Sequence, residues 1–297
     1  MYRAHFGLSE APFGITPDTA FAFSGRSHQE ALNTLLVALS SGEGFIKIVG
    51  EVGTGKTLLC RRLLATLDPA QYVTAYIPNP QLDPRTLLLA VAEELSVVLN
   101  RRGDQHHLLK RLNRALLDFA ASEKTVVLCV DEAQALPLES LEALRLLSNL
   151  ETEKRKLLHV VLFAQPELDA KLADPSVRQL RQRIAFSCRL EGLDRDEVDV
   201  YLAHRLRVAG YRGQGLFTAP AVRRLHRAAR GVPRLLNILA NKALLLAFGE
   251  GGQAVMARHV SAAMQDSAEA RQSRPRCLWW LGATAAASVV GLWAVAR

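Results

Sequence analysis

Short, nearly uncharged runs rich in β-branched residues alternate along the chain with longer stretches in which apolar residues recur at helical spacing. The short runs predict five strands, at 45–49, 73–77, 125–130, 157–164 and 184–190. Between them, helical periodicity covers 58–67, 84–99, 108–119 and 138–150. Strands that alternate with helices are typical of a parallel sheet covered on both faces. An α/β base domain is therefore predicted over residues 1–192.

The pattern changes at about residue 194, where strands stop and only helical periodicity remains. Helices are predicted at 197–209, 220–230, 233–248 and 257–268. Thr218 and Pro220 resemble an N-cap and an early-turn proline, and Gly210 and Gly231 resemble helix stops. A small all-α lid domain is therefore predicted over residues 193–269.

A glycine-rich octapeptide, G-E-V-G-T-G-K-T, joins the first predicted strand to the helix that follows it. Strand, glycine-rich turn and helix form the context that the P-loop motif G-x-x-x-x-G-K-[ST] requires. In such a loop, backbone N–H groups surround the phosphates, the lysine reaches the β- and γ-phosphates, and the hydroxyl binds Mg²⁺. The predicted ATP-binding residues are Gly50, Glu51, Val52, Gly53, Thr54, Gly55, Lys56, Thr57 and Leu58.

Two acidic residues, Asp131 and Glu132, directly follow the uncharged strand at 125–130. Beside a P-loop, Asp131 would hold Mg²⁺ together with Thr57, and Glu132 would act as general base toward the attacking water. Two acids can also simply end a buried strand. Paired with the P-loop, they favour an enzyme that hydrolyses ATP.

Composition is consistent with two domains and an appended segment. Of the chain's residues, 49% are hydrophobic and 22% are charged. Its length of 297 residues exceeds the length at which one hydrophobic core suffices. Its four cysteines show no C-x-x-C spacing, so neither a disulfide framework nor a zinc site is expected. The N-terminus lacks the basic and apolar regions of a signal peptide.

The stretch 277–296 contains no charged residue. A helix of that length spans about 30 Å, the thickness of the hydrocarbon core of a bilayer. The basic linker 270–276 precedes it and contains three arginines, whereas only Arg297 follows it. The positive-inside rule then predicts a single-pass transmembrane helix with the domains 1–269 in the cytoplasm. The alternative is an apolar helix packed on the core.

Several segments together carry a family resemblance: the opening M-Y-R-A-H-F-G-L-S-E-A-P-F-G-I-T-P-D, S-H-Q-E-A-L (27–32), A-Q-P-E-L (164–168), L-R-Q-R-I (180–184) and G-V-P-R-L-L-N (231–237). Over residues 1 to about 268 the chain resembles the ExeA/GspA-type AAA+ ATPases. Its wording is most similar to the MshM type, which serves biogenesis of the MSHA-type (type IV) pilus. The resemblance implies ATP hydrolysis in a homo-oligomer, either a ring or another assembly, with inner-membrane pilus or type II secretion components as partners. Together with the Mg²⁺ expected at the P-loop and the predicted span, this indicates an ATPase at the bacterial inner membrane.

The same resemblance implies roles for residues outside the two motifs. Gln165 takes the sensor-1 position, and Arg234 takes the sensor-2 position that contacts the γ-phosphate from the lid. Arg181 or Arg183 would supply an arginine finger to the neighbouring subunit. For Gln165 the alternative is a Gln-Pro turn that caps 166–172. For the arginines the alternative is a solvated basic face.

The lid carries much of the formal net charge of +8. Its arginines include Arg205, Arg207, Arg212, Arg223, Arg224, Arg227 and Arg230. Such a surface can bind DNA, as in the related TniB-type and origin-recognition ATPases, or an anionic lipid surface. It can equally be a solvated face or a subunit contact. Near the N-terminus, Phe6, Pro12, Phe13 and Ile15 could line the adenine slot or pack in a core.

Overall fold

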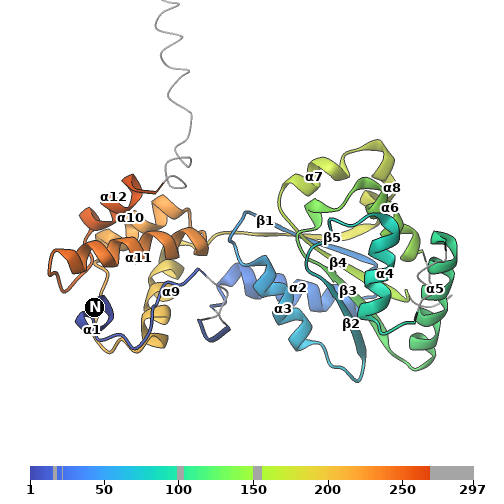
Figure 1. The fold of residues 1–297 in the computed structure, drawn as a ribbon, viewed down its shortest axis with the longest axis horizontal. Coiled ribbons are helices and arrows are strands. Elements are labelled where there is room, and N and C mark those ends of the chain that lie inside the picture. The colour runs from blue at the N-terminus through green and yellow to red at the C-terminus, as the bar shows by residue number, and fades with distance from the viewer. Residues whose placement is uncertain (16–18, 22, 99–103, 150–155, 268–297) are drawn as a thin grey trace, which may run out of the picture.

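The computed structural model describes residues 1–15, 19–21, 23–98, 104–149 and 156–267. Two bodies lie side by side in Figure 1, a sheet-containing base and a helical lid. The predicted linker 270–276 and the predicted span 277–296 lie outside the described residues. Within the described residues, no helix combines the length and the apolar character needed to cross a membrane.

The base is built on a parallel sheet of five strands in the order β2-β3-β4-β1-β5. The strands are β1 (Phe45–Gly50), β2 (Tyr72–Ile77), β3 (Thr125–Val130), β4 (Leu158–Ala164) and β5 (Ile184–Leu190). Each agrees with its predicted bounds to within one residue. The sheet order places β4 between β1 and β3, so the residues that follow these three strands share one edge of the sheet.

Helices cover both faces of the sheet because alternate strand residues are apolar on both sides. On β3, Val127 and Cys129 pack with α2 (Arg26–Ser40) and α3 (Lys56–Thr66). Val126 and Leu128 point the other way and belong to the core cluster on the opposite face. That cluster is covered by α4 (Pro84–Glu94), α5 (Gln105–Ala121), α6 (Leu138–Leu147), α7 (Glu167–Leu172) and α8 (Arg178–Arg183), with the short turns η2 (Ala133–Ala135) and η3 (Pro175–Val177).

Helix ends are where the structure departs from the predicted elements. The helix predicted to reach residue 99 ends at Glu94, because Ser96 adopts φ 55° and the Val97 N–H donates to the Ala92 carbonyl at 2.8 Å. The helix predicted over 138–150 ends at Leu147. Helix α2 was not predicted, and α8 occupies a stretch of which only the L-R-Q-R-I motif was noted.

The lid consists of α9 (Arg195–Val208), α10 (Ala219–Ala229), α11 (Pro233–Gly249) and α12 (Ala257–Gln265). A capping box begins α9: the Glu197 N–H donates to Asp194 Oδ1 at 2.8 Å, and the Asp194 N–H donates to Glu197 Oε2 at 2.9 Å. Thr218 lies at the N-cap of α10 as predicted, but its side chain makes no capping hydrogen bond.

The N-terminal segment packs on the lid, although the predicted division placed it in the base. It contains α1 (Tyr2–His5) and η1 (Thr19–Phe21), and runs beside the lid helices in Figure 1. Phe6 and Phe13 are buried in the lid core, and the Phe13 ring meets that of Phe217 edge-on at 5.6 Å. The core-packing interpretation therefore holds for both phenylalanines.

Two glycines hold the connection between base and lid close to the loop before α11. The Leu193 N–H donates to the Gly231 carbonyl at 2.9 Å. Gly231 has φ +73°, and a Cβ built there would lie 2.0 Å from the Leu193 carbonyl oxygen. On the facing side, a Cβ at Gly192 would lie 2.4 Å from the Arg230 carbonyl oxygen. Neither position has room for a side chain, so the connection and the loop are expected to move as one piece.

Replacing Gly231 tests this close packing. Gly251 is the matched control, since it also has positive φ, +68°, but no heavy atom lies within 4 Å of a Cβ built on it. Gly251→Ala should cost about 1 kcal/mol from the backbone alone. Gly231→Ala should cost a further ~2 kcal/mol or more, because the backbone must shift to relieve the overlap. Urea unfolding of the two variants measures both losses, and equal losses would show that the contact has no structural importance.

Candidate functional site

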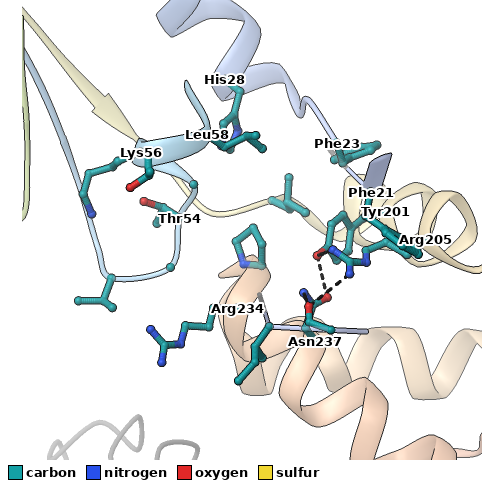
Figure 2. Close-up of a pocket in the computed structure, with 18 of the residues that line it drawn as sticks. Phe21, Phe23, His28, Thr54, Lys56, Leu58, Tyr201, Arg205, Arg234 and Asn237 are labelled. Atoms are coloured by element: carbon teal, nitrogen blue, oxygen red, sulfur yellow. Dashed lines mark hydrogen bonds between the residues drawn. The ribbon is translucent and has the colours of Figure 1, made fainter. Parts of the chain in front are cut away.

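A cavity of about 310 Å³ lies between the base and the lid, at the edge where β1, β3 and β4 end. Figure 2 shows the P-loop side chains on one wall and those of the lid on the other. Its volume is in the range of small-ligand sites. The residues that line it include Gly14, Ile15, Phe21, Phe23, His28, Val52, Gly53, Thr54, Gly55, Lys56, Thr57, Leu58, Arg61, Glu132, Tyr201, Arg205, Arg234 and Asn237.

The P-loop takes its shape from two glycines with left-handed backbone, Gly53 at φ +82° and Gly55 at φ +97°. A side chain at Gly55 would meet the imidazole of His28, whose Nε2 lies 2.7 Å from the built Cβ position. His28 is buried, and that burial lowers its pKa. Helix α3 begins directly after Gly55, so its N-terminus faces the cavity and favours an anion there.

Lys56 bonds back onto the loop that carries it. Its Nζ donates to the carbonyls of Gly50 at 2.8 Å and Glu51 at 3.0 Å. Burial lowers the pKa of Lys56, and the nearby carboxylates, Glu132 first, oppose that shift. Gly50 and Glu51 therefore contribute carbonyls to the loop and do not line the cavity, whereas residues 52–58 do.

The hydroxyl of Thr57, which lines the cavity, contacts the carboxylate of Asp131. Thr57 Oγ1 donates to Asp131 Oδ2 at 2.6 Å, and the buried Asp131 also accepts from the Glu132 N–H at 3.0 Å. Tyr76 OH lies 3.5 Å from the same Oδ2; burial and the charge of Asp131 raise the pKa of Tyr76 to about 12. Hydroxyl and carboxylate oxygens are ligands that suit Mg²⁺.

Nothing else in the described chain could complete a metal site by itself. Within residues 1–15, 19–21, 23–98, 104–149 and 156–267, no group of three or more His, Cys, Asp or Glu side chains could hold a metal ion. Mg²⁺ commonly keeps water and phosphate oxygens beside one or two protein ligands. The pair of Thr57 and Asp131 therefore fits Mg²⁺ bound together with a nucleotide.

Two glutamine amides hold the carboxylate of Glu132, which lines the cavity. Its Oε2 accepts from Gln165 Nε2 at 2.8 Å and from Gln134 Nε2 at 2.5 Å. The Gln134 amide oxygen accepts from the Gln165 N–H at 3.0 Å, which fixes its NH₂ toward Glu132. Glu132 itself has φ 50°, a left-handed conformation that costs energy for a residue with a side chain. Sequence analysis missed Gln134, although its place in D-E-A-Q could have suggested it.

Arg234 reaches the site from the lid, in the first turn of α11. It lines the cavity, and its Cβ would lie 2.5 Å from a Cβ built on Gly53. Figure 2 shows its guanidinium on the P-loop side of the helix. The start of α11 and the P-loop are thus packed against each other.

The opposite end of the cavity is lined by the N-terminal segment and α9. Ile15, Phe21 and Phe23 give it an apolar wall. The Tyr201 hydroxyl donates to Asn237 Oδ1 at 2.7 Å, and Asn237 Nδ2 donates to the Gly14 carbonyl at 3.1 Å (Figure 2). Ile15 therefore lines the cavity as one interpretation proposed, whereas Phe6, Pro12 and Phe13 do not.

Arg205 does not belong to the basic surface with which it was grouped. It is buried, and its Nε donates to the Pro12 carbonyl at 2.6 Å. Its Cζ lies 4.6 Å from the centre of the Phe21 ring, a cation–π distance. Arg181 and Arg183, the two candidates for the arginine finger, lie on α8 and do not line the cavity of their own chain.

The comparisons place the base in a known domain family. Residues 39–172 match the family described as an AAA domain. General secretion pathway protein A of Aeromonas hydrophila is 43% identical over 263 residues, which cover 89% of this chain and 48% of that protein. The chain thus spans about half the length of this curated relative.

Solved structures with low sequence identity share the fold. Cdc6p from Pyrobaculum aerophilum aligns with TM-score 0.62 and 19% identity, over 88% of this chain and 75% of its own. Drosophila ORC bound to DNA gives 0.61 and 17%, over 93% and 69%. The Thermotoga maritima RuvB Holliday junction branch migration motor gives 0.54 and 16%, over 85% and 72%. The predicted α/β fold is confirmed.

Replacing Gln134 tests how the Glu132 carboxylate is held. Gln134→Leu should lower kcat for ATP hydrolysis roughly tenfold to a hundredfold while leaving KM within about threefold, because Gln134 does not line the cavity. Gln134→Glu should also move the acid limb of the kcat–pH profile to higher pH, since a second carboxylate would face Glu132. Steady-state phosphate release measures both variants. Unchanged kcat in Gln134→Leu would show that the contact is incidental.

Proposed function

The chain belongs to the ExeA/GspA-type AAA+ ATPases, and from this premise we propose that it binds Mg²⁺ and ATP in the cavity between base and lid and hydrolyses the ATP there. One observation carries the proposal: the Thr57–Asp131 contact lies beside Glu132, whose carboxylate is held by amide groups. Arg234 of the lid lines the same cavity as the P-loop. An anion site, a site for a hard cation and a carboxylate base thus converge at one edge of the sheet.

The triphosphate would lie along the P-loop. The N–H groups of residues 53–58 and the start of α3 would surround the phosphates, and Lys56 would leave the carbonyls of Gly50 and Glu51 for phosphate oxygens. Thr57 and Asp131 would hold Mg²⁺, which supplies charge neutralisation between the β- and γ-phosphates. The base and ribose would occupy the apolar end lined by Ile15, Phe21 and Phe23.

Glu132 would accept a proton from the attacking water. Its two amide donors keep the carboxylate oriented, and Gln165, whose NH₂ donates to that carboxylate, would orient the same water, the sensor-1 role. Arg234 would contact the γ-phosphate, the sensor-2 role. Because Arg234 packs on Gly53 while Asn237, one turn later, bonds to Gly14, one helix would report phosphate loss to both ends of the cavity.

The decisive experiment separates binding from hydrolysis. Glu132→Gln preserves shape but removes the base, so phosphate release should fall at least about a hundredfold while ATP affinity stays within a few fold. Equilibrium binding of a fluorescent ATP analogue, with and without Mg²⁺, checks the second half. Lys56→Ala is the companion variant and should lose binding. Hydrolysis by Glu132→Gln at the wild-type rate would exclude Glu132 as the base.

A homo-oligomer would complete the site. Neither Arg181 nor Arg183 lines the cavity of its own chain, yet Arg181 is exposed on α8 and Arg183 is half-buried. In a ring, one of them would extend into the cavity of the neighbouring subunit and stabilise the charge that develops on the transferring phosphoryl group.

Mixing inactive variants tests this arrangement. Arg181→Ala or Arg183→Ala should lower turnover of the assembled protein by two or more orders of magnitude. Mixed with Lys56→Ala, the responsible variant should regain part of its activity, because some interfaces then pair an intact P-loop with an intact finger. Phosphate release from the mixtures measures the recovery. If neither arginine variant lowers turnover, the finger is elsewhere.

The cellular role that we propose is support for assembly of a type II secretion machine or of an MSHA-type pilus, the system served by the MshM type that the sequence motifs resemble. The relative's name, General secretion pathway protein A, supports the secretion branch. The uncharged stretch 277–296 and the arginines before it support a single-pass anchor in the bacterial inner membrane, with the ATPase body in the cytoplasm. The partners would then be inner-membrane components of either machine.

A DNA transaction of the TniB or origin-recognition type is the second candidate. The basic face of α10 favours it, because arginines at helical spacing can neutralise successive phosphates. The likeness to Drosophila ORC bound to DNA shows the fold alone.

A further inference from the structure

A second cavity, of about 390 Å³, lies between α10 and α12 of the lid. Arg223, Arg224 and Arg227 line it together with apolar residues, among them Pro220, Ala228 and Met264. It shares no residue with the nucleotide cavity. In Figure 1, α10 and α12 lie next to each other, beside α11. We call this feature the arginine groove.

Within the described residues, no ion pair neutralises the positive charge of the arginine groove. Helices α10 and α12 contain no acidic residue. In the part of the chain that the structure describes, none of the three arginines forms an ion pair. The nearby acids are already paired: Glu250 with Arg258 at 2.8 Å and His259 at 3.0 Å, and Asp266 with Lys242 at 2.8 Å. Three guanidiniums around one hollow would repel one another, so an anionic ligand is the expected partner.

We propose that the arginine groove binds the phosphate groups of anionic phospholipids and so docks the lid on the membrane surface. Guanidinium groups beside an apolar lining suit a membrane–water interface, where the guanidiniums contact lipid phosphates and the apolar residues contact acyl chains. Arginine also binds phosphate through two parallel hydrogen bonds, which Lys cannot do. The bidentate contact suits the phosphate of either a lipid or DNA, whereas the apolar lining matches a lipid headgroup layer better than a fully hydrated DNA backbone.

The position of the groove along the chain supports the same partner, and this step depends on the proposed anchor. Met264 lines the groove, and residues 265–276, with Arg271, Arg274 and Arg276, separate it from the uncharged stretch that begins at Cys277. Twelve residues reach at most about 40 Å even when fully extended. A chain anchored through 277–296 would therefore hold the arginine groove close to the headgroups. Each arginine near an anionic surface would add to its attraction.

Vesicle binding of the full chain tests the proposal. The test variant is Arg223→Glu/Arg224→Glu/Arg227→Glu, and the matched control is Lys110→Glu/Arg111→Glu/Arg114→Glu on the exposed face of α5, with the same change in net charge. Flotation with phosphatidylcholine vesicles, with and without about 30% phosphatidylglycerol, gives the partition coefficients. Anionic lipid should raise the partition coefficients of wild type and control, and this increase should be smaller by roughly tenfold or more for the test variant. High salt should remove the gain as well.

The outcomes separate this inference from the anchor. Binding of all three proteins to neutral vesicles reports the membrane span alone. If none of them binds neutral vesicles, the proposed anchor is wrong, but the comparison on anionic vesicles still tests the arginine groove. An equal gain for the test variant and wild type on anionic vesicles would overturn the arginine groove. So would retardation of duplex DNA that the test variant loses while lipid binding is unchanged, because the partner would then be nucleic acid. Hydrogen exchange of α10, slowed by anionic vesicles in wild type but not in the test variant, locates the contact, and thermal unfolding checks that both variants fold.

Discussion

The short contact between the Thr57 hydroxyl and the Asp131 carboxylate is the constraint around which the site is organised. It joins the helix after β1 to the residue after β3, although β4 lies between these strands in the sheet. Parallel strands make this possible, because their carboxyl ends all open at one edge. Glu132 follows Asp131 directly, and Gln165 directly follows β4, so the same edge also holds the proposed base and one of its two amide partners. Any shift of β3 relative to β1 would separate these groups.

The lid matters because α11 contacts both ends of the cavity within one turn. Arg234 packs on the P-loop, and Asn237 bonds to the N-terminal segment. The facing glycines at 192 and 231 tie the start of this helix to the connection from the base. In addition, Glu197 Oε1 accepts from the Arg26 N–H at 2.5 Å, so the first turn of α9 also caps a helix of the base. Rotation of the lid would alter all of these contacts together, which suits a protein that converts phosphate loss into motion.

Arg205, Arg234 and the three arginines of the arginine groove lie in different surroundings. Arg205 is buried without a carboxylate partner, and backbone carbonyls with an aromatic ring offset its charge. Arg234 lines the nucleotide cavity, where a phosphate would be its counter-charge. Arg223, Arg224 and Arg227 surround a separate groove and have no partner in the described chain. A net charge counted from the sequence combines all three groups.

The sequence by itself determined the five strands and the positions of the P-loop and of Asp131-Glu132 after β1 and β3. Strand positions follow from contiguous apolar runs, and the P-loop and Asp131-Glu132 are unbroken motifs whose chemistry depends on neighbours in the chain. Only the tertiary structure decided what depends on distant partners: the N-terminal segment on the lid, Gln134 between Glu132 and Gln165, and Arg205 against Pro12, 193 positions away. Local periodicity and spacing record which face of an element is apolar, but not which remote group will satisfy a buried polar atom, because that choice is made when the core packs.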